Sequence, residues 1–145
     1  MKASIPGVTQ HVITEVKLQA KATLPREARL RYGYQYDSVH KKGISVHGAL
    51  FRLACLSPSD VSPTQCGIIT SRRVGGAVVR NKIKRRLRTL YRLDRNLIIP
   101  GLWIVIIAKS KASTASLADL RAEWVRLGKR LSIFKNEQPL FHHLS

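Results

Sequence analysis

The sequence predicts an α+β domain, a small α/β sandwich in which helices pack against a sheet of about four strands. The 145 residues are the length of one domain, and 44% of them are hydrophobic, which is enough for a packed core. Short apolar, β-branched runs typical of strands alternate with longer stretches whose apolar residues recur at helical spacing. The predicted order of elements is helix, strand, strand, strand, helix, strand, helix (α-β-β-β-α-β-α).

The first half of the chain supplies one helix and three strands. We expect the helix in "LPREARLRYGYQYDSVHKKG" (24–43), because Pro25 suits a helix start and Gly43 a helix stop. Two strands are expected in "ISVHGALFRLACL", over residues 44–46 and 50–56, and a short buried strand in "QCGIITS". The Ser-, Pro- and Asp-bearing stretch "SPSDVSPT" predicts a loop between them.

The second half supplies a helix, a strand and a last helix. The first of these helices is expected over about 79–92, after the basic, glycine-bearing connection "RRVGG". The run "LWIVIIA" is apolar throughout and preceded by Pro100 and Gly101, which is typical of a buried strand. The stretch "STASLADLRAEWVRLGKRLSIF" predicts the last helix, with a capping box at Ser116 and Asp119. Its apolar stripe consists of Leu117, Leu120, Trp124, Leu127 and Leu131.

The domain is expected to span residues 24–134, between an N-terminal extension of uncertain order (1–23) and a C-terminal tail (135–145). The N-terminus lacks the apolar region of a signal peptide, and no run approaches the ~20 apolar residues of a membrane-spanning helix. Cys55 and Cys66 lie in apolar, strand-like segments, where we expect them to be buried and reduced. These features predict a cytoplasmic protein with no membrane partner.

The charge balance is strongly basic. The chain has 26 Lys and Arg against 8 Asp and Glu, a net charge of +18. A protein that repels itself this strongly usually has a polyanionic partner, most often a nucleic acid. A membrane surface is the competing polyanion, but no basic helix here has a bulky apolar face free for lipid.

The basic helix over 79–92 has two opposite faces on a helical wheel. Its apolar stripe, which we expect in the core, consists of Val79, Ile83, Leu87 and Leu90. The opposite face and its flanks consist of Arg80, Asn81, Lys82, Lys84, Arg85, Arg88, Thr89 and Arg92. A solvated helix face usually gains from Glu–Lys pairs four residues apart, whereas this stretch has no acid. The uncompensated repulsion favours a surface for an anionic partner, and arginine suits bidentate contact with phosphate.

The connection before this helix is also suited to an anion. Gly75 and Gly76 permit close approach to the backbone at the helix N-terminus, where free N–H groups and the helix dipole favour negative charge. Arg72 and Arg73 stand just before these glycines. The Gly-Lys-Ser/Thr ending of a Walker A loop is missing, which argues against a nucleotide-hydrolysing site.

No catalytic constellation is recognisable, and we expect no catalytic residue in the protein. The five histidines lack ligand spacing with the two cysteines, so no metal site is expected. The eight carboxylates are too scattered to predict a two-metal nuclease. The sequence therefore indicates a binding protein, and any reaction that it supports would be carried by another component.

The stretch "SRRVGGAVVRNKIKRRLR" resembles the signature of the protein component of bacterial ribonuclease P. That signature is a serine with a basic pair, then Gly-x-Ala-Val, then Arg-Asn-x-x-Lys-Arg. The matching residues are Ser71, Arg72, Arg73, Gly75, Ala77, Val78, Arg80, Asn81, Lys84 and Arg85. The resemblance extends over roughly residues 24–133.

The resemblance implies a subunit of a ribonucleoprotein endoribonuclease that removes the 5′ leader from precursor tRNA. It implies one protein per catalytic RNA, magnesium ions held mainly by that RNA, and a left-handed crossover around the central helix, an exception to the usual handedness. The RNA subunit would contact Arg72, Arg73, Arg80, Asn81, Lys82, Lys84, Arg85, Arg88 and Arg92. A cleft between the first helix and the sheet would hold the single-stranded leader against Tyr36, His40 and Phe51.

The sequence also departs from the family pattern. The departures are Gly76 for a frequent Asn, Lys82 for Arg, His40 for the second aromatic of the first helix, and Ala54 for a strand aromatic. Tyr36 has an alternative interpretation as a half-buried core residue, and Phe51 as a core residue. The alternative function is a ribosomal or other structural RNA-binding protein with no associated reaction. A DNA-compacting basic protein is a more distant alternative.

Overall fold

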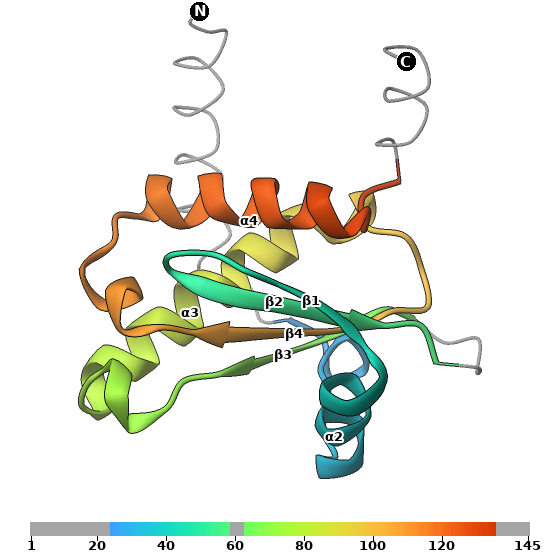
Figure 1. Cartoon of the computed structure of the whole chain (residues 1–145), viewed down its shortest axis with the longest axis horizontal. Coiled ribbons are helices and arrows are strands. Elements are labelled where there is room, and N and C mark those ends of the chain that lie inside the picture. Colours follow the sequence, from blue (N-terminus) through green and yellow to red (C-terminus); the bar gives the residue numbers. More distant parts are fainter. Residues whose placement is uncertain (1–23, 59–62, 136–145) are drawn as a thin grey trace, which may run out of the picture.

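The computed structural model describes residues 24–58 and 63–135 (Figure 1). The strands of this part are β1 (Ile44–His47), β2 (Phe51–Leu56), β3 (Gln65–Ile69) and β4 (Trp103–Ala108). The longer helices are α2 (Gly33–Lys42), α3 (Ala77–Asp94) and α4 (Leu117–Leu131). Short 3₁₀ turns are formed by Arg26–Ala28, Arg72–Val74, Arg95–Leu97 and Ser110–Thr114. The predicted α+β class and the order of elements are confirmed. Within the described ranges, no helix is both long and apolar enough to cross a membrane.

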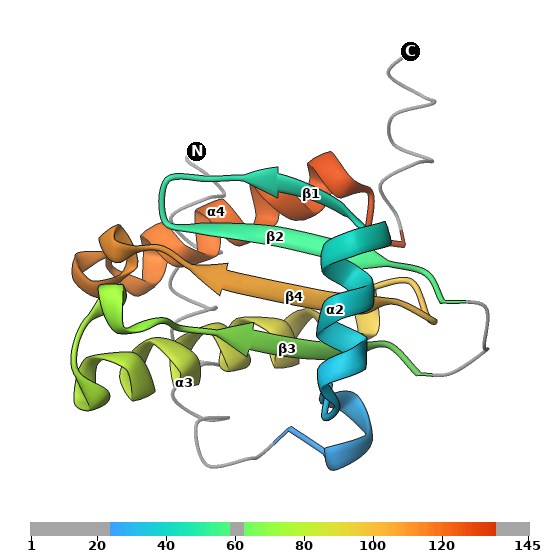
Figure 2. The same ribbon diagram turned by 60° about the horizontal axis from the view of Figure 1, so that its bottom comes forward.

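The sheet is mixed, with the strand order β1-β2-β4-β3. β2 pairs antiparallel with β1 on one side and with β4 on the other. β3 pairs parallel with β4, so the chain must cross over one face of the sheet, through α3, between these two strands. Figure 2 views the sheet from the α2 side, with α3 behind it; β3 and β4 both point left, and β4 lies above β3. From the opposite, α3 side, with both strands turned to point up, β4 therefore lies to the left of β3. The crossover is therefore left-handed, as the family resemblance implies, whereas the great majority of such connections are right-handed.

Helices cover the two faces of the sheet unequally. α3 and α4 lie on one face, and α2 crosses the other near one end of the strands (Figures 1 and 2). Successive strand residues point to opposite faces, so each face has its own apolar cluster. The larger cluster, on the side of α3 and α4, includes Phe51, Leu53, Ile104, Ile106, Leu87 and Trp124. The smaller cluster consists of Leu30, Val39, Ala54 and Val105, with Tyr36, Leu56, Trp103 and Ile107 packed against it.

The first helix begins later than the sequence predicts. α2 begins at Gly33, and the preceding residues 29–32 are not helical. The reason is that this segment pairs with β3: the Leu30 N–H donates to the Cys66 carbonyl at 3.1 Å. The side-chain oxygen of buried Gln35 then accepts two N–H groups of the same segment, at 2.8 and 2.9 Å. The predicted helix over 24–43 is thus wrong in its first part, because contacts with the sheet replace helical hydrogen bonds.

The last helix is fastened to α3 through a buried acid. The Asp94 carboxylate accepts hydrogen bonds from Arg121 Nη1 at 2.5 Å and from Trp124 Nε1 at 2.7 Å, both on α4. The predicted capping box is confirmed, since the Asp119 N–H donates to Ser116 Oγ at 3.0 Å. These contacts fix the two helices that cover the larger cluster.

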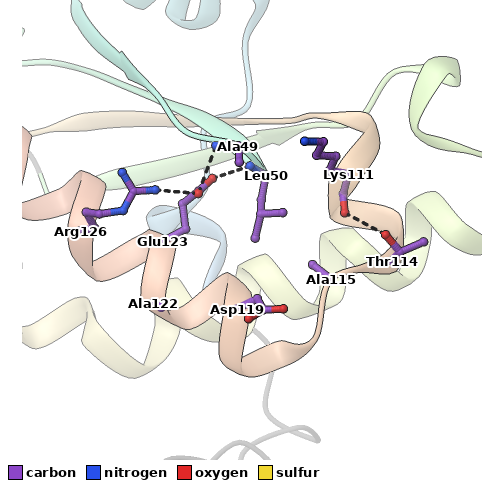
Figure 3. A pocket seen from close by; sticks show the side chains of 9 residues that line it. All are labelled: Ala49, Leu50, Lys111, Thr114, Ala115, Asp119, Ala122, Glu123 and Arg126. Atoms are coloured by element: carbon purple, nitrogen blue, oxygen red, sulfur yellow. Dashed lines mark hydrogen bonds and ion pairs between the residues drawn. The ribbon is translucent and has the colours of Figure 1, made fainter.

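α4 also holds the β1–β2 hairpin through Glu123 (Figure 3). The buried Glu123 carboxylate accepts the N–H groups of Ala49, Leu50 and Phe51 at 3.2, 2.7 and 2.9 Å. Arg126 Nη2 donates to the same carboxylate at 2.9 Å. Three converging backbone N–H groups form an anion-binding arrangement, and here the protein's own carboxylate fills it.

Candidate RNA interface

α3 presents one apolar and one cationic face, as the sequence predicts. Ile83, Leu87 and Leu90 are at most 2% exposed, and Val79 packs against the same cluster. On the opposite face, Asn81, Lys82 and Arg85 are exposed. An open hollow in this face is lined by Val78, Asn81, Lys84, Arg85 and Arg88. None of these lining residues is acidic, so the hollow is suited to a polyanion.

Some polar groups of α3 are engaged within the protein. Arg86 Nη1 donates to the Ala115 carbonyl at 3.1 Å. Thr89 is buried, and its Oγ1 donates to the Arg85 carbonyl at 2.8 Å. Arg92 is partly buried, and this burial lowers the pKa of its guanidinium, which still stays charged. The exposed cationic face is therefore narrower than the helical wheel suggests, because Thr89 is buried and Arg92 is partly buried. Arg86 has a structural role.

The N-terminus of α3 is open to an anion. Gly75 has a φ of 153°, which favours glycine, and an added Cβ would come within 2.9 Å of Val79 Cγ1. Gly76, at the N-cap position, has no side chain with which to bond the first-turn N–H groups. Arg72 and Arg73 are exposed in the turn just before it. Uncapped N–H groups, the helix dipole and two guanidinium groups thus combine at this end of α3.

A groove of about 240 Å³ lies between α2 and the sheet, on the face opposite α3. The lining residues are Tyr36, Asp37, Val39, His40, Arg52, Ala54, Ile69, Val105 and Ile107. Two of the three residues expected in the leader cleft, Tyr36 and His40, are therefore brought together there, with Ala54 beside them. An apolar surface with an aromatic ring, an imidazole and a guanidinium matches the chemistry that holds single-stranded nucleic acid.

Tyr36 is both half-buried and part of the groove. Its ring lies over Gly67 of β3, because a Cβ added to Gly67 would overlap the ring. Burial is the largest influence that raises the pKa of Tyr36; Cys66 raises this pKa as well, and the charge of Arg88 lowers it. The charge of Arg88, on α3, thus influences Tyr36 on the opposite face of the sheet.

Phe51 does not line the groove, contrary to expectation. Its side chain is fully buried in the larger cluster, on the side of α3 and α4. The following residue, Arg52, lines the groove instead, because neighbouring strand residues point to opposite faces. The Nε atom of Arg52 is buried without a hydrogen-bond partner among the described atoms. Strand alternation could have identified Arg52, since it lies two residues before Ala54 on the same face.

The acidic side chains do not gather into a metal site. Asp94 and Glu123 are bound to α4 and to the hairpin, Asp119 caps α4, and Asp37 lies at the groove. Over residues 24–58 and 63–135, no group of three or more His, Cys, Asp or Glu side chains could hold a metal ion. Asp94, Asp119 and Glu123 thus serve structure.

Comparison with known proteins identifies the family. The ribonuclease P family model matches residues 24–132. The chain is 40% identical over 117 residues to the ribonuclease P protein component of Acidothermus cellulolyticus, covering 79% of this chain and 97% of that protein. The RNase P protein of Staphylococcus aureus has a similar structure, with a TM-score of 0.69 at 25% identity over 74% of this chain and 98% of that one. The structure of the RNase P protein of Thermotoga maritima is also similar, with a TM-score of 0.63 at 28% identity; the match covers 70% of this chain and 96% of that one.

The matched region contains the basic helix, its glycine-bearing N-terminus and the groove beneath α2. The fold, the signature and the relatives therefore agree, and the chain belongs to the ribonuclease P protein family, the RNA-binding protein components of the ribonucleoprotein endoribonuclease that processes the 5′ ends of tRNA.

Proposed function

We propose that the chain binds the catalytic RNA of ribonuclease P through α3 and the 5′ leader of precursor tRNA through the groove beneath α2. The observation that carries this proposal is the presence of two different RNA-suited surfaces on opposite faces of one sheet. A protein that only covers a structured RNA needs a single such surface. Two surfaces allow the chain to hold the enzyme's RNA and its substrate at once.

The RNA-subunit surface is built for phosphates. It consists of Arg72, Arg73, Arg80, Asn81, Lys82, Lys84, Arg85, Arg88 and Arg92. Guanidinium groups bind phosphate in bidentate geometry, and the uncapped N-terminus of α3 adds backbone N–H donors. Such a surface recognises the backbone and shape of a folded RNA rather than its base sequence. Within this proposal, one protein binds one catalytic RNA.

The leader surface is built for unstacked bases. Tyr36 and His40 offer ring faces, and Arg52 adds a guanidinium whose Nε lacks a partner in the described structure. Stacking tolerates any base and contributes ~1–3 kcal/mol per base. This tolerance suits an enzyme whose leaders differ from one precursor to the next.

We assign no catalytic residue to the protein. Magnesium ions would be held mainly by the RNA subunit, because the described carboxylates are dispersed, and Asp94 and Glu123 are engaged in structural contacts. The protein would bind and orient the substrate, in the cytoplasm with both RNAs.

Reconstitution with a bacterial ribonuclease P RNA tests the proposal. Adding the full-length protein at low magnesium should accelerate leader removal from precursor tRNA. The protein freed of RNA should cleave nothing. Binding of the RNA without any stimulation of cleavage would favour a structural RNA-binding protein, and cleavage by the protein alone would overturn the assignment of chemistry to the RNA.

A further inference from the structure

Gly67 lies in the middle of β3, where the backbone does not require a glycine. In the described part of the chain, the glycines with a positive φ are Gly75 and Gly101, and Gly67 has the extended backbone of its strand. A glycine inside a strand weakens that strand, and its presence often marks a site that another group approaches closely. The missing side chain of Gly67 is therefore explained by the space that it leaves, not by backbone freedom.

The group that uses this space is the ring of Tyr36, on α2. A Cβ added to Gly67 would lie 2.6 Å from Cε1 and from Cζ of Tyr36, and closer still to its Oη. Carbon atoms in favourable contact are ~3.5–4.0 Å apart, so any side chain at position 67 would displace the ring by about 1 Å. The same ring lines the groove beneath α2. The lack of a side chain at Gly67 thus determines how close to the sheet this ring lies.

The start of α2 is fixed to the strand residues just before this glycine. The Cys66 carbonyl accepts the Leu30 N–H at 3.1 Å, and Gln65 Oε1 accepts a hydrogen bond from Gln35 Nε2 at 3.0 Å. Gln35 is buried and immediately precedes Tyr36. Because the backbone of α2 is held at this point, a methyl group added to the strand would move the Tyr36 ring rather than the helix.

The floor of the groove beside the ring is made of small side chains. Gly67 pairs with Val105 on β4, and Val105 pairs with Ala54 on β2, so the three residues form one row across the sheet. Directly paired residues face the same side of a sheet, and both Val105 and Ala54 line the groove. The aromatic surface above this row therefore comes from Tyr36, and its height above the strands depends on Gly67.

We propose that Gly67 is a positioning residue of the leader site: it lets the Tyr36 ring lie on β3, at the depth at which the ring can stack on a base of the leader. This inference rests on the proposed binding of the leader in the groove. A ring displaced by about 1 Å would occupy part of the space that a base needs and would lose contacts with it, because dispersion attraction weakens over such small gaps.

A double-substitution cycle tests the proposal in the enzyme reconstituted from the full-length protein and a bacterial ribonuclease P RNA. The measured quantities are the dissociation constants of precursor tRNA and of mature tRNA, which lacks the leader. Gly67→Ala should weaken precursor binding about 5- to 150-fold, the range for one lost stacking contact, and leave mature tRNA unaffected. In protein that already carries Tyr36→Ala, Gly67→Ala should cause no further loss, because no ring is left to displace.

Gly33→Ala is the matched control on α2. A Cβ added there meets no atom within 4 Å, so this variant should bind precursor tRNA like the wild type. Wild-type precursor affinity of Gly67→Ala would overturn the positioning role, and so would a loss that adds to that of Tyr36→Ala. An equal loss for mature tRNA, or a Gly67→Ala protein without a cooperative thermal transition, would also overturn it, because Gly67 would then support the fold.

The Tyr36→Ala variant separates this inference from the proposed function. If Tyr36→Ala weakens precursor binding selectively and Gly67→Ala does not, only the positioning role fails. If Tyr36→Ala leaves precursor binding unchanged, or weakens both tRNAs equally, the leader site itself fails.

Discussion

Arg52 and Tyr36 give the groove two kinds of contact. The Arg52 Nε is buried beside apolar residues without a partner in the described structure, and such a donor costs about 1–3 kcal/mol until an acceptor reaches it. A phosphate of a bound strand would satisfy it. In the proposed leader site, the Tyr36 ring, held over Gly67, would provide the flat surface for a base.

Replacing Tyr36 by alanine removes that surface without touching α3. We expect Tyr36→Ala to weaken the binding of precursor tRNA to the reconstituted enzyme by ~1–3 kcal/mol. Mature tRNA, which lacks the leader, should bind the variant and the wild type equally well. Equal losses for both tRNAs in the same titration would show that Tyr36 serves only the core.

Among the elements, α3 carries some charged side chains that support the fold and others that are exposed. Arg86 bonds the segment before α4, and Asp94 joins the end of α3 to α4, whereas Arg85 is exposed above the open hollow. The exposed cations meet no acid within the helix before Asp94. Binding and stability should therefore respond to different substitutions of this one helix.

Arg85→Ala is expected to flatten the salt dependence of RNA-subunit binding by about one unit, because one phosphate contact is lost. Its thermal unfolding should match that of the wild type. Ile83→Ala is the opposite control: it should destabilise the protein by about 2–5 kcal/mol and leave the salt slope unchanged. A lowered Tm for Arg85→Ala would show that this side chain supports the fold.

The hairpin depends on α4 through one carboxylate. Glu123→Ala leaves three hairpin N–H groups without their acceptor, so we expect a loss of about 3 kcal/mol in the free energy of unfolding. Arg126→Ala removes only an exposed partner of the same carboxylate and should cost under about 1 kcal/mol. Urea unfolding of the two variants compares them, and equal losses would mean that the ion pair, rather than the N–H bonds, holds the hairpin.

At the scale of the whole molecule, a net charge of +18 opposes the folded state. Screening by salt should therefore stabilise the isolated protein. We expect its Tm to rise as sodium chloride increases from about 0.05 to about 0.3 M, where the Debye length becomes shorter than the spacing of many surface charges. A falling Tm would mean that ion pairs such as Asp94–Arg121 outweigh the repulsion among the cations.

The sequence predicted most of the fold, because periodicity and capping are local. The apolar stripe of α3, the run "LWIVIIA" and the Ser116 cap all depend on neighbouring residues, and all are confirmed. The start of α2 depends on pairing with β3, which no local pattern contains. The groove was predicted in part, because Tyr36 and His40 do line it. Phe51 was expected there, but its side chain points to the opposite face of the sheet and Arg52 lines the groove instead. The edge-to-face contact between the Tyr34 and Trp103 rings was not predicted, because only the fold brings these two residues together.

The parallel pairing of β3 with β4 has a consequence for folding kinetics. β1 and β2 are joined by residues 48–50 and can pair early, whereas β3 and β4 are separated by residues 70–102 and can pair only after α3 has crossed the sheet. This late step brings the cations of α3, which repel one another, close to the other cations of a basic chain. Pairing between strands far apart in the sequence is slow even without such repulsion. We expect polyanions, and above all the cognate RNA, to accelerate refolding in stopped-flow measurements. A chain that meets its RNA during synthesis would then expose the unpaired edge of β4 for less time, and with it the risk of aggregation.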